Sequence, residues 1–510
     1  MNENTQKIKF FQQKIVSLYA KFLQLPILLK IGMSTSIVVL LVILLLFKIN
    51  RTPSKSTETE AIHYDFDANF NEKEYLATPI YEPLTMQYGD NQLPESVSLL
   101  PYAPNRLHQG RQGSSVGWAC SYAAHTILYA AANQRAPDAV AFSPAFIFNQ
   151  IAGPNCKGAF LKKGLECLQA VGNLPIRQFN YNEQNCYVSP TTEDRQAARR
   201  FRIKGFYRLT QRGEANKPDM NAIRQHLAQG IPVIAGMQVG GTFLHQMNSR
   251  AIWLPTQQDF KKNDFFGHAV AIVGYDDSLE GGAFQLMNSW GSDWGQSGVA
   301  WIPYRDFLFF AEEVYSFFPE DTQSKKDRKR LAARVQILEE TSGSPLDLSA
   351  IDAAVFKAIF EPSDGLNFKI IIQNFLACYI YIFSENAAGD SEVLFPYSVN
   401  HAAYCGIRGT RIFPENGFLT IENEKTHQHL AIVFAKKSLN WENVNNLING
   451  SRQNSFTEKV QEALAMETVL DVEFKTGNAI EFSCEIFDRN AVATIIKLPT
   501  EKKMHDLQSE

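Results

Sequence analysis

The hydrophobic positions divide this chain into regions with different patterns. Residues 31–47 form an uncharged, largely apolar run, long enough to span a bilayer as a helix. Between residues 93 and 320 helical and strand-like patterns alternate: 220–229 predicts an amphipathic helix and 232–239 a buried strand. Beyond residue 340, short alternating or apolar runs separated by turn-forming residues predict a β-sandwich over 341–510 with a polar tail.

The N-terminal pattern predicts one transmembrane helix over 31–47. A secretory signal peptide is the competing interpretation, but the run begins thirty residues in and no small-residue cleavage site follows it. Apolar residues at helical spacing predict that residues 1–30 form an amphipathic segment. Its apolar face would lie on the inner membrane surface or pack on a partner. Five lysines precede the run against three basic residues after it, which favours a cytoplasmic N-terminus.

Two further segments are predicted to connect the domains. Residues 48–92 are polar and lack sustained helical periodicity, which predicts a tether. Residues 321–340 contain a cluster of basic residues and predict a charged linker or helix surface, with a membrane-surface contact as the minor alternative. The cluster comprises Lys325, Lys326, Arg328, Lys329 and Arg330.

Composition limits the function classes only slightly. With 510 residues, 45% of them hydrophobic and 20% charged, the chain is an ordinary globular protein of more than one domain. A net charge of −4 gives no reason to expect nucleic acid. The seven cysteines have neither CxxC spacing nor neighbouring histidines, so we expect no metal site, and nothing implies a cofactor.

Three motifs carry the candidate chemistry. Gln109-Gly-Arg-Gln-Gly-Ser-Ser115 is a Gly/Ser-rich loop before a predicted helix. A strand-like run, 266–275, contains His268, and Asn288-Ser-Trp290-Gly-Ser-Asp-Trp294 follows it. In order and spacing these motifs resemble the papain-like cysteine peptidase family (C1), with 153 residues from Ser115 to His268 and 20 more to Asn288. In that family the catalytic cysteine stands six residues after the glutamine, and here that position is Ser115.

The resemblance implies an α+β fold for 93–320 with two lobes, one helical and one like a β-barrel, and a peptide-binding cleft between them. It places residue 115 at the positive N-terminus of a helix. His268 would act as base and acid, Asn288 would orient its ring, and Gln109 would stabilise the oxyanion with the backbone N–H of residue 115. Supporting positions are Trp290, which would cover the His–Asn bond, and Gly113, Ser114 and Trp294.

Serine changes what this site can do. A hydroxyl has no accessible anionic state near neutral pH, so it cannot form the thiolate–imidazolium pair that a cysteine would. Cys120 is no substitute, because five residues along a helix rotate it about 140° away from Ser115. Three interpretations stay open: a peptide-binding protein with impaired catalysis, a native serine hydrolase, and an active cysteine peptidase whose cysteine has been replaced by serine.

The family's other features are partly retained. Its Cys-Asn-Gly-Gly turn is represented by Cys156-Lys-Gly-Ala, and that cysteine pairs in the family with one three residues before the nucleophile, which is Gln112 here. We therefore expect a disulfide from Cys156 to Cys186, with Cys167 as an alternative partner. Papain-like zymogens carry a longer helical pro-region before the domain, and its absence here suggests that no propeptide restrains the site.

Four stretches stand out in the C-terminal region: Tyr379-Ile-Tyr-Ile-Phe, Ala388-Gly-Asp, Leu394-Phe-Pro-Tyr and Arg411-Ile-Phe-Pro. Together they resemble a bacterial β-sandwich domain of unknown function that occurs beside peptidase and kinase domains. That resemblance suggests recognition or scaffolding, with a possible envelope protein as partner. Together these expectations describe a single-pass membrane protein whose peptidase-like domain is periplasmic or otherwise extracytoplasmic and takes a peptide or protein as its ligand or substrate.

Overall fold

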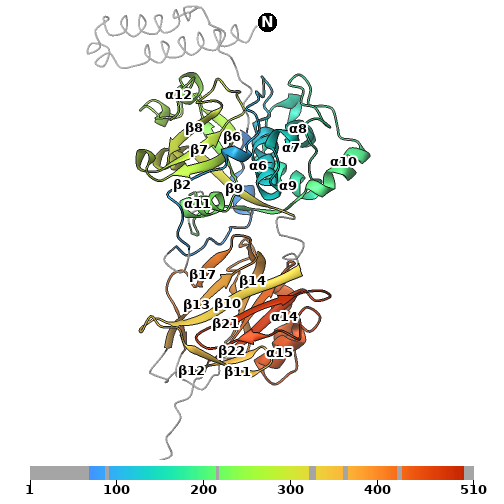
Figure 1. The fold of residues 1–510 in the computed structure, drawn as a ribbon, viewed down its shortest axis with the longest axis vertical. Helices are drawn as coiled ribbons and strands as arrows, with labels where there is room; N and C mark the ends of the chain where they lie inside the picture. Colours follow the sequence, from blue (N-terminus) through green and yellow to red (C-terminus); the bar gives the residue numbers. More distant parts are fainter. Residues whose placement is uncertain are drawn as a thin grey trace, which may run out of the picture. The chain divides into compact units, whose positions relative to one another are not determined.

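The computed structural model describes residues 68–86, 91–213, 217–320, 329–359, 366–386, 388–421 and 428–498 (Figure 1). The predicted amphipathic segment 1–30 and transmembrane helix 31–47 lie outside these ranges. Within them, no helix is both long and apolar enough to cross a membrane. All of the described residues belong to one compact unit.

The first part of this unit has two lobes. Helices lie on one side and the strands of a sheet on the other (Figure 1). The helical lobe contains a continuous helix of three pieces, α5 (Ser115–Gly117), π-helical η2 (Trp118–His125) and α6 (Thr126–Asn133), with α7 (Pro137–Val140), α8 (Pro144–Ile151), α9 (Leu161–Ala170) and α10 (Thr192–Ala198).

The second lobe is an antiparallel sheet in the order β4-β9-β5-β6-β7-β8. Its strands are β4 (Ile203–Arg208), β9 (Ala311–Pro319), β5 (Val233–Val239), β6 (Phe266–Asp276), β7 (Ala283–Met287) and β8 (Val299–Pro303), and β2 (Ser96–Ser98) pairs with β6. Helices α11 (Met220–Ala228), α12 (Gly241–His245) and α13 (Tyr304–Phe310) accompany it. The predicted helix 220–229 and strand 232–239 are thus confirmed as α11 and β5.

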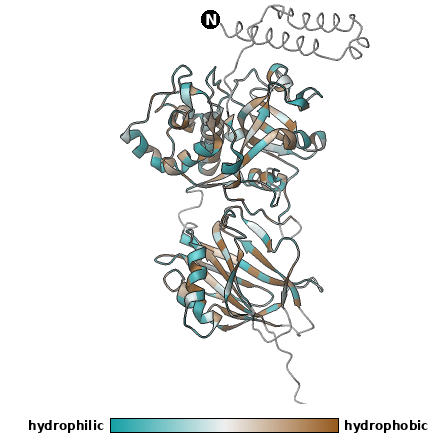
Figure 2. Ribbon diagram, turned by 180° about the vertical axis from the view of Figure 1, so that it is seen from behind, coloured by the Kyte–Doolittle hydropathy of each residue, from teal (hydrophilic) through white to brown (hydrophobic). Residues whose placement is uncertain are grey.

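The C-terminal part contains two β-sheets that share a hydrophobic core, to which Val335, Ile372 and Ile432 contribute. One sheet has the order β17-β13-β10-β21-β20, with β18 on β13, and the other has the order β11-β12-β22-β19-β14-β15, with β16 on β14. Figure 2 shows that many of these strands carry hydrophobic residues.

The strand bounds are β10 (Arg330–Glu339), β11 (Asp347–Asp352), β12 (Val355–Ile359), β13 (Leu366–Asn374), β14 (Cys378–Glu385), β15 (Ser391–Phe395), β16 (Tyr404–Cys405), β17 (Gly409–Phe413), β18 (Leu419–Ile421), β19 (Gln428–Ala435), β20 (Phe474–Lys475), β21 (Ile480–Glu485) and β22 (Ala491–Leu498). Helices α14 (Trp441–Gly450) and α15 (Phe456–Ala463) follow β19. A β-rich C-terminal region is what the sequence predicts for 341–510.

The predicted linker 321–340 is wrong in its second half. Residues 330–339 form β10, which pairs with both β13 and β21 in the interior of its sheet. Leu331, Ala333, Val335 and Ile337 are buried at alternate positions. This period-2 pattern is typical of a strand with one face in a core, and the basic cluster in front of it concealed the signal.

The predicted tether 48–92 is also wrong for residues 68–86. These residues form β1 (Ala68–Asn69) and α4 (Glu72–Leu76), and Tyr75 and Tyr81 are each only 1% exposed. Asn71 caps α4 by accepting a hydrogen bond from the Glu74 N–H at 3.2 Å. The average composition of this stretch is polar, so the two tyrosines were not recognised as anchors. Large aromatic side chains bury far more apolar surface than their number suggests.

Tyr81 connects this segment to the C-terminal part. Its hydroxyl accepts hydrogen bonds from the Ile407 N–H (2.8 Å) and from Arg411 Nη2 (3.0 Å). The Arg411 guanidinium is fully buried and also donates from Nε to the Glu82 carbonyl oxygen at 3.0 Å. Buried charge-assisted bonds of this kind fix geometry closely, so residues 81–82 hold the two parts of the unit together.

Candidate active site

Ser115 is the first residue of the central helix and is fully buried. Its hydroxyl oxygen accepts a hydrogen bond from the Ala269 N–H at 3.2 Å. Gly117 lets this helix lie against α8, because a Cβ atom there would be 2.6 Å from the Pro144 carbonyl oxygen. Ser115 therefore sits where the helical lobe meets β6, at a positive helix N-terminus.

His268 lies near the start of β6, and Asn288 directly follows β7. The two side chains are joined by a hydrogen bond of 2.8 Å between His268 Nε2 and Asn288 Oδ1. Asn288 Oδ1 also accepts the Ser289 N–H at 2.7 Å, which identifies this atom as the oxygen. In the neutral ring Nε2 therefore carries the proton, and Nδ1 is the basic nitrogen.

Two tryptophans enclose this pair. The Trp290 ring lies 4.5 Å from the His268 ring, centroid to centroid. Trp294 packs edge-on against Trp290 at 5.9 Å and donates from Nε1 to the Phe243 carbonyl oxygen at 3.0 Å. These rings therefore shield the His–Asn hydrogen bond from water. In such low-dielectric surroundings the bond is electrostatically stronger than it would be in solution.

Burial also controls the charge of the histidine. It lowers the pKa of His268 to about 4, because desolvation of the imidazolium outweighs the opposing effect of the bond to Asn288. The ring is consequently neutral at pH 7, and the site holds a neutral histidine beside a neutral hydroxyl.

Gln109 lies in the loop before Ser115 and contacts the residue that follows Asn288. It is fully buried, and its Oε1 accepts the Ser289 hydroxyl at 2.5 Å. Its Nε2 donates to the Gln112 carbonyl oxygen at 2.9 Å, so one of the two amide hydrogens is engaged within the loop. The structure brings Gln109, Ser115, His268 and Asn288 together, while their catalytic roles stay predictions.

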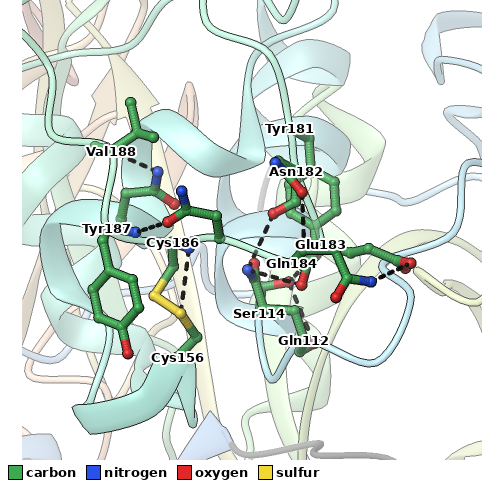
Figure 3. Close-up of a disulfide and its surroundings, with 12 residues drawn as sticks. Gln112, Ser114, Cys156, Tyr181, Asn182, Glu183, Gln184, Cys186, Tyr187 and Val188 are labelled. Carbon is green, nitrogen blue, oxygen red and sulfur yellow. Dashed lines mark hydrogen bonds between the residues drawn. A yellow bond between two sulfur atoms is a disulfide. The ribbon is translucent and has the colours of Figure 1, made fainter.

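The loop before Ser115 is held by a neighbouring segment, shown in Figure 3. Ser114 Oγ and the Tyr181 hydroxyl share a hydrogen bond of 2.7 Å, and the Tyr181 hydroxyl donates to the Gln109 carbonyl oxygen at 2.6 Å. Gln112 Nε2 reaches the carbonyl oxygens of Asn182 (3.3 Å) and Glu183 (3.4 Å). Gln112 therefore links the loop to this segment through hydrogen bonds, at the position where the family has a disulfide-forming cysteine. Gly113 is buried in the same loop.

Cys156 and Cys186 form a disulfide, the pairing named from the sequence (Figure 3). Cys167, the alternative partner, is a buried free thiol. Cys120 is also free and fully buried, and burial raises the pKa of its thiol, which disfavours the reactive thiolate. Among the described residues, no group of three His, Cys, Asp or Glu side chains could hold a metal ion.

Residues 68–76, which we call the cleft segment, lie next to this site. β1 pairs in parallel with Ala159–Phe160 (β3), next to the Cys156 turn. The Ala68 carbonyl oxygen also lies against β6, since a Cβ atom on Gly267 would be only 2.0 Å from it. The segment therefore touches both the helical lobe and the residue preceding His268.

Tyr75 anchors the cleft segment. Its hydroxyl oxygen accepts the Val314 N–H at 3.1 Å and lies 3.4 Å from the Val314 carbonyl oxygen and 3.3 Å from Thr210 Oγ1. Its ring packs edge-on against Tyr315 at 5.3 Å. All of these partners belong to the strand lobe or the segment that follows β4.

Sequence reasoning missed several of these contacts. Ser289 lies inside a recognised motif, so its hydroxyl could have been considered as a partner of Gln109. Tyr181 and Ala68 are far from any motif, and no sequence signal indicates that they approach the site.

The two lobes, with Ser115 on a helix and His268 and Asn288 on the opposing sheet, define a fold of the cysteine-peptidase class. Residues 107–307 match the family model described as papain family cysteine protease.

Individual relatives cover the same region. An uncharacterized peptidase C1-like protein of Acanthamoeba polyphaga mimivirus is 25% identical over 214 residues, which are 40% of this chain and 66% of that protein. Peptidase 1 of Dermatophagoides pteronyssinus is 29% identical over 163 residues, which are 31% of this chain and 45% of the mite protein. The chain thus spans less than two thirds of either relative.

Among solved structures, xylellain, a cysteine protease from Xylella fastidiosa, is similar. It is 22% identical, with a TM-score of 0.41, and the match covers 50% of this chain and 95% of xylellain.

Proposed function

We propose that the papain-like part of this chain binds an extended peptide between its lobes and that serine at position 115 makes it catalytically impaired. The supporting observation is the assembled pair of His268 and Asn288, joined at 2.8 Å, beside a hydroxyl held by the Ala269 N–H. A binding cleft needs the surrounding architecture, whereas rapid acyl transfer also needs an activated nucleophile.

A native serine hydrolase is the second candidate, and one observation favours it. The Asn288 oxygen is fixed by the Ser289 N–H, so the histidine presents the tautomer in which Nδ1 can accept a hydroxyl proton. Asparagine supplies no negative charge to stabilise the imidazolium that would form, however, unlike the aspartate of a serine peptidase. We therefore place impaired catalysis first.

The test compares the full chain with Ser115→Ala and Ser115→Cys on a library of internally quenched peptides. We expect cleavage only by Ser115→Cys, because a thiol is more acidic and more nucleophilic than a hydroxyl. Cleavage by the unchanged chain that disappears in Ser115→Ala would establish the serine hydrolase instead.

Two controls identify the nucleophile. Adding His268→Ala to Ser115→Cys should abolish cleavage. Adding Cys120→Ser should leave cleavage intact, since Cys120 is buried and burial raises the pKa of its thiol. If no variant cuts or retains any peptide, the proposed function is wrong.

The cleft segment bears on the same proposal. A peptide that uses the edge at Ala159–Phe160 must replace β1, which pairs with that edge. We propose that displacement of residues 68–70 precedes peptide binding. The measured affinity is then the intrinsic affinity multiplied by the fraction of molecules in which these residues are displaced.

Membrane attachment and partners are proposals from the sequence alone. The apolar run 31–47 supports a single-pass anchor with a cytoplasmic N-terminus, and the C-terminal domain would bind an envelope protein. Labelling of a cysteine introduced at Ser54 by an impermeant reagent in intact cells tests the topology. Protection of that cysteine would contradict an extracytoplasmic peptidase-like domain.

A further inference from the structure

One cavity of the structure includes none of the candidate active-site residues. It has a volume of about 340 Å³ and lies between β4 and the C-terminal part, beside β14 and β16. Sites for small ligands span about 300–1,000 Å³, so the cavity is large enough for a small organic molecule. Its polar and aromatic walls include Lys204, Tyr207, Tyr379, His401, Tyr404 and Trp441.

Lys204, on β4, brings an ammonium group to the cavity. Its Nζ lies 4.4 Å from the centre of the Tyr404 ring and 5.1 Å from the centre of the Tyr379 ring. The ring faces attract the cation, but among the described residues this nitrogen has no hydrogen-bond acceptor and no carboxylate partner. Burial, reinforced by the nearby Lys436 ammonium, lowers the pKa of Lys204 to about 8. The group is still mostly protonated at pH 7, and its desolvated charge favours the approach of an anion.

Tyrosine hydroxyls add further hydrogen-bond donors to the cavity. Those of Tyr207, Tyr379 and Tyr404 make no hydrogen bond within the described ranges. Gly205 also lines the cavity and leaves room for the first of them, because a Cβ atom there would be 3.2 Å from the Tyr207 oxygen. Each hydroxyl can therefore donate to a ligand oxygen.

Acidic side chains are missing from the cavity walls. Neither aspartate nor glutamate is among the described residues that line it. His401, on the same walls, already has a carboxylate beside it, because its Nε2 lies 2.8 Å from Glu82 Oε2. The cavity thus combines an ammonium without an anion and several available donors. This combination matches a carboxylate, which only accepts hydrogen bonds.

Aromatic rings form much of the remaining surface. The Tyr379 and Tyr404 rings lie 5.0 Å apart, and Tyr207 stacks on Tyr404 at 6.0 Å, centroid to centroid. Trp441, the first residue of α14, lines the cavity from the C-terminal part. Rings in such a group favour offset or edge-on contact with a further ring, so we expect the body of the ligand to be aromatic.

We propose that this cavity binds a carboxylate joined to an aromatic ring. The carboxylate pairs with the Lys204 ammonium and accepts hydrogen bonds from the tyrosine hydroxyls. The ring packs among Tyr379, Tyr404 and Trp441. Free aromatic acids and peptides that end in an aromatic residue both present this group. The cavity shares no residue with the candidate active site, so this proposal does not rest on the proposed function.

The first experiment titrates three probes into the full chain and follows the NMR signals of the probes. They are N-acetylphenylalanine, its neutral amide, and N-acetylalanine. We expect the second and third to bind at least tenfold more weakly, because the amide lacks the charge and the alanine compound lacks the ring. If N-acetylphenylalanine does not bind, or binds no better than either of the others, the proposal is overturned. This comparison uses the unchanged chain and does not depend on how a variant folds.

The second experiment places the binding at Lys204. Lys204→Met removes the charge at nearly constant length and should reduce the affinity for N-acetylphenylalanine to that for its amide. Lys204→Arg keeps the charge and should retain the preference for the acid. Lys357→Met is the matched control, because Lys357 is an exposed lysine on β12 that does not line the cavity, and its affinity should stay within about twofold. An unchanged affinity in Lys204→Met would overturn the proposal.

A third comparison distinguishes the two sources of the ligand. 3-Phenylpropanoate represents free aromatic acids, and N-acetyl-Ala-Ala-Phe with a free carboxylate represents a peptide end. Tighter binding of the peptide assigns the cavity to peptide C-termini, whereas equal or weaker binding assigns it to free acids. Each titration is repeated with Lys204→Met, and only the affinity lost in that variant counts, since binding that remains belongs to another site. Either assignment supports the proposal, and loss of neither probe in Lys204→Met contradicts it.

Discussion

Tyr75→Phe tests whether the cleft segment controls access to the site. The substitution removes only the hydroxyl that accepts the Val314 N–H at 3.1 Å. With phenylalanine, that N–H stays buried without its partner while the segment is closed, but meets water when the segment opens. A buried unsatisfied donor costs about 1–3 kcal/mol. Opening should therefore become about 5- to 150-fold more favourable, at roughly 1.4 kcal/mol per factor of ten.

Hydrogen–deuterium exchange measures this change directly on the full chain. Exchange of residues 68–76 should accelerate by the same factor, and peptide affinity should rise with it. Tyr129→Phe is the matched control, because the Tyr129 ring packs on Phe142 and Phe201 in the helical lobe, away from the cleft segment. The hydroxyl has no anchoring role if residues 68–76 of Tyr75→Phe exchange within twofold of the unchanged chain. An equal effect of Tyr129→Phe would refute that role as well.

Two further predictions concern stability. Replacing Cys156 and Cys186 with serine opens a loop with a sequence separation of 30 residues, which should lower the free energy of unfolding by about 3.6 kcal/mol in the chain-entropy model. Urea denaturation checks this, with Cys167→Ser as control, and a loss below 1 kcal/mol would contradict it. The second concerns the buried His268, whose folded pKa of about 4 lies below the usual 6.5. Its stabilising contribution should be complete above pH 6.5 and decline as pH falls toward 4, by up to about 1.4 kcal/mol per pH unit. A urea midpoint independent of pH down to 4.5 would argue against a neutral buried ring.

The arrangement of the site was largely predictable because its chemistry is concentrated in short motifs. Ser115, His268, Asn288 and Trp290 are recognisable by order and spacing, and the fold brings them together. The direction of the Gln109 amide was not predictable, since it depends on the Gln112 carbonyl oxygen and the Ser289 hydroxyl. Such local choices are made by hydrogen-bond competition that no residue pattern records.

The contacts made by residues 68–86 were missed for a different reason. β1 is only two residues long and pairs with a strand about ninety positions away, so it has no periodicity of its own. Its position depends on distant anchors such as Tyr75 and Tyr81. β10 shows the converse case, in which clear alternation from Leu331 to Ile337 was present but was outweighed by the preceding basic residues.

The electrostatics of the closed site are consistent with a hydroxyl at position 115. Full burial lowers the pKa of His268 to about 4, so a lone imidazolium is strongly disfavoured there. A thiol could still charge the ring by transferring its proton, because the thiolate would supply a compensating negative charge beside it and the helix N-terminus would stabilise that charge. A serine hydroxyl cannot supply that charge near neutral pH. The same enclosure that strengthens the His268–Asn288 bond therefore keeps the serine form in its neutral state, and this is the physical reason for placing peptide binding before catalysis.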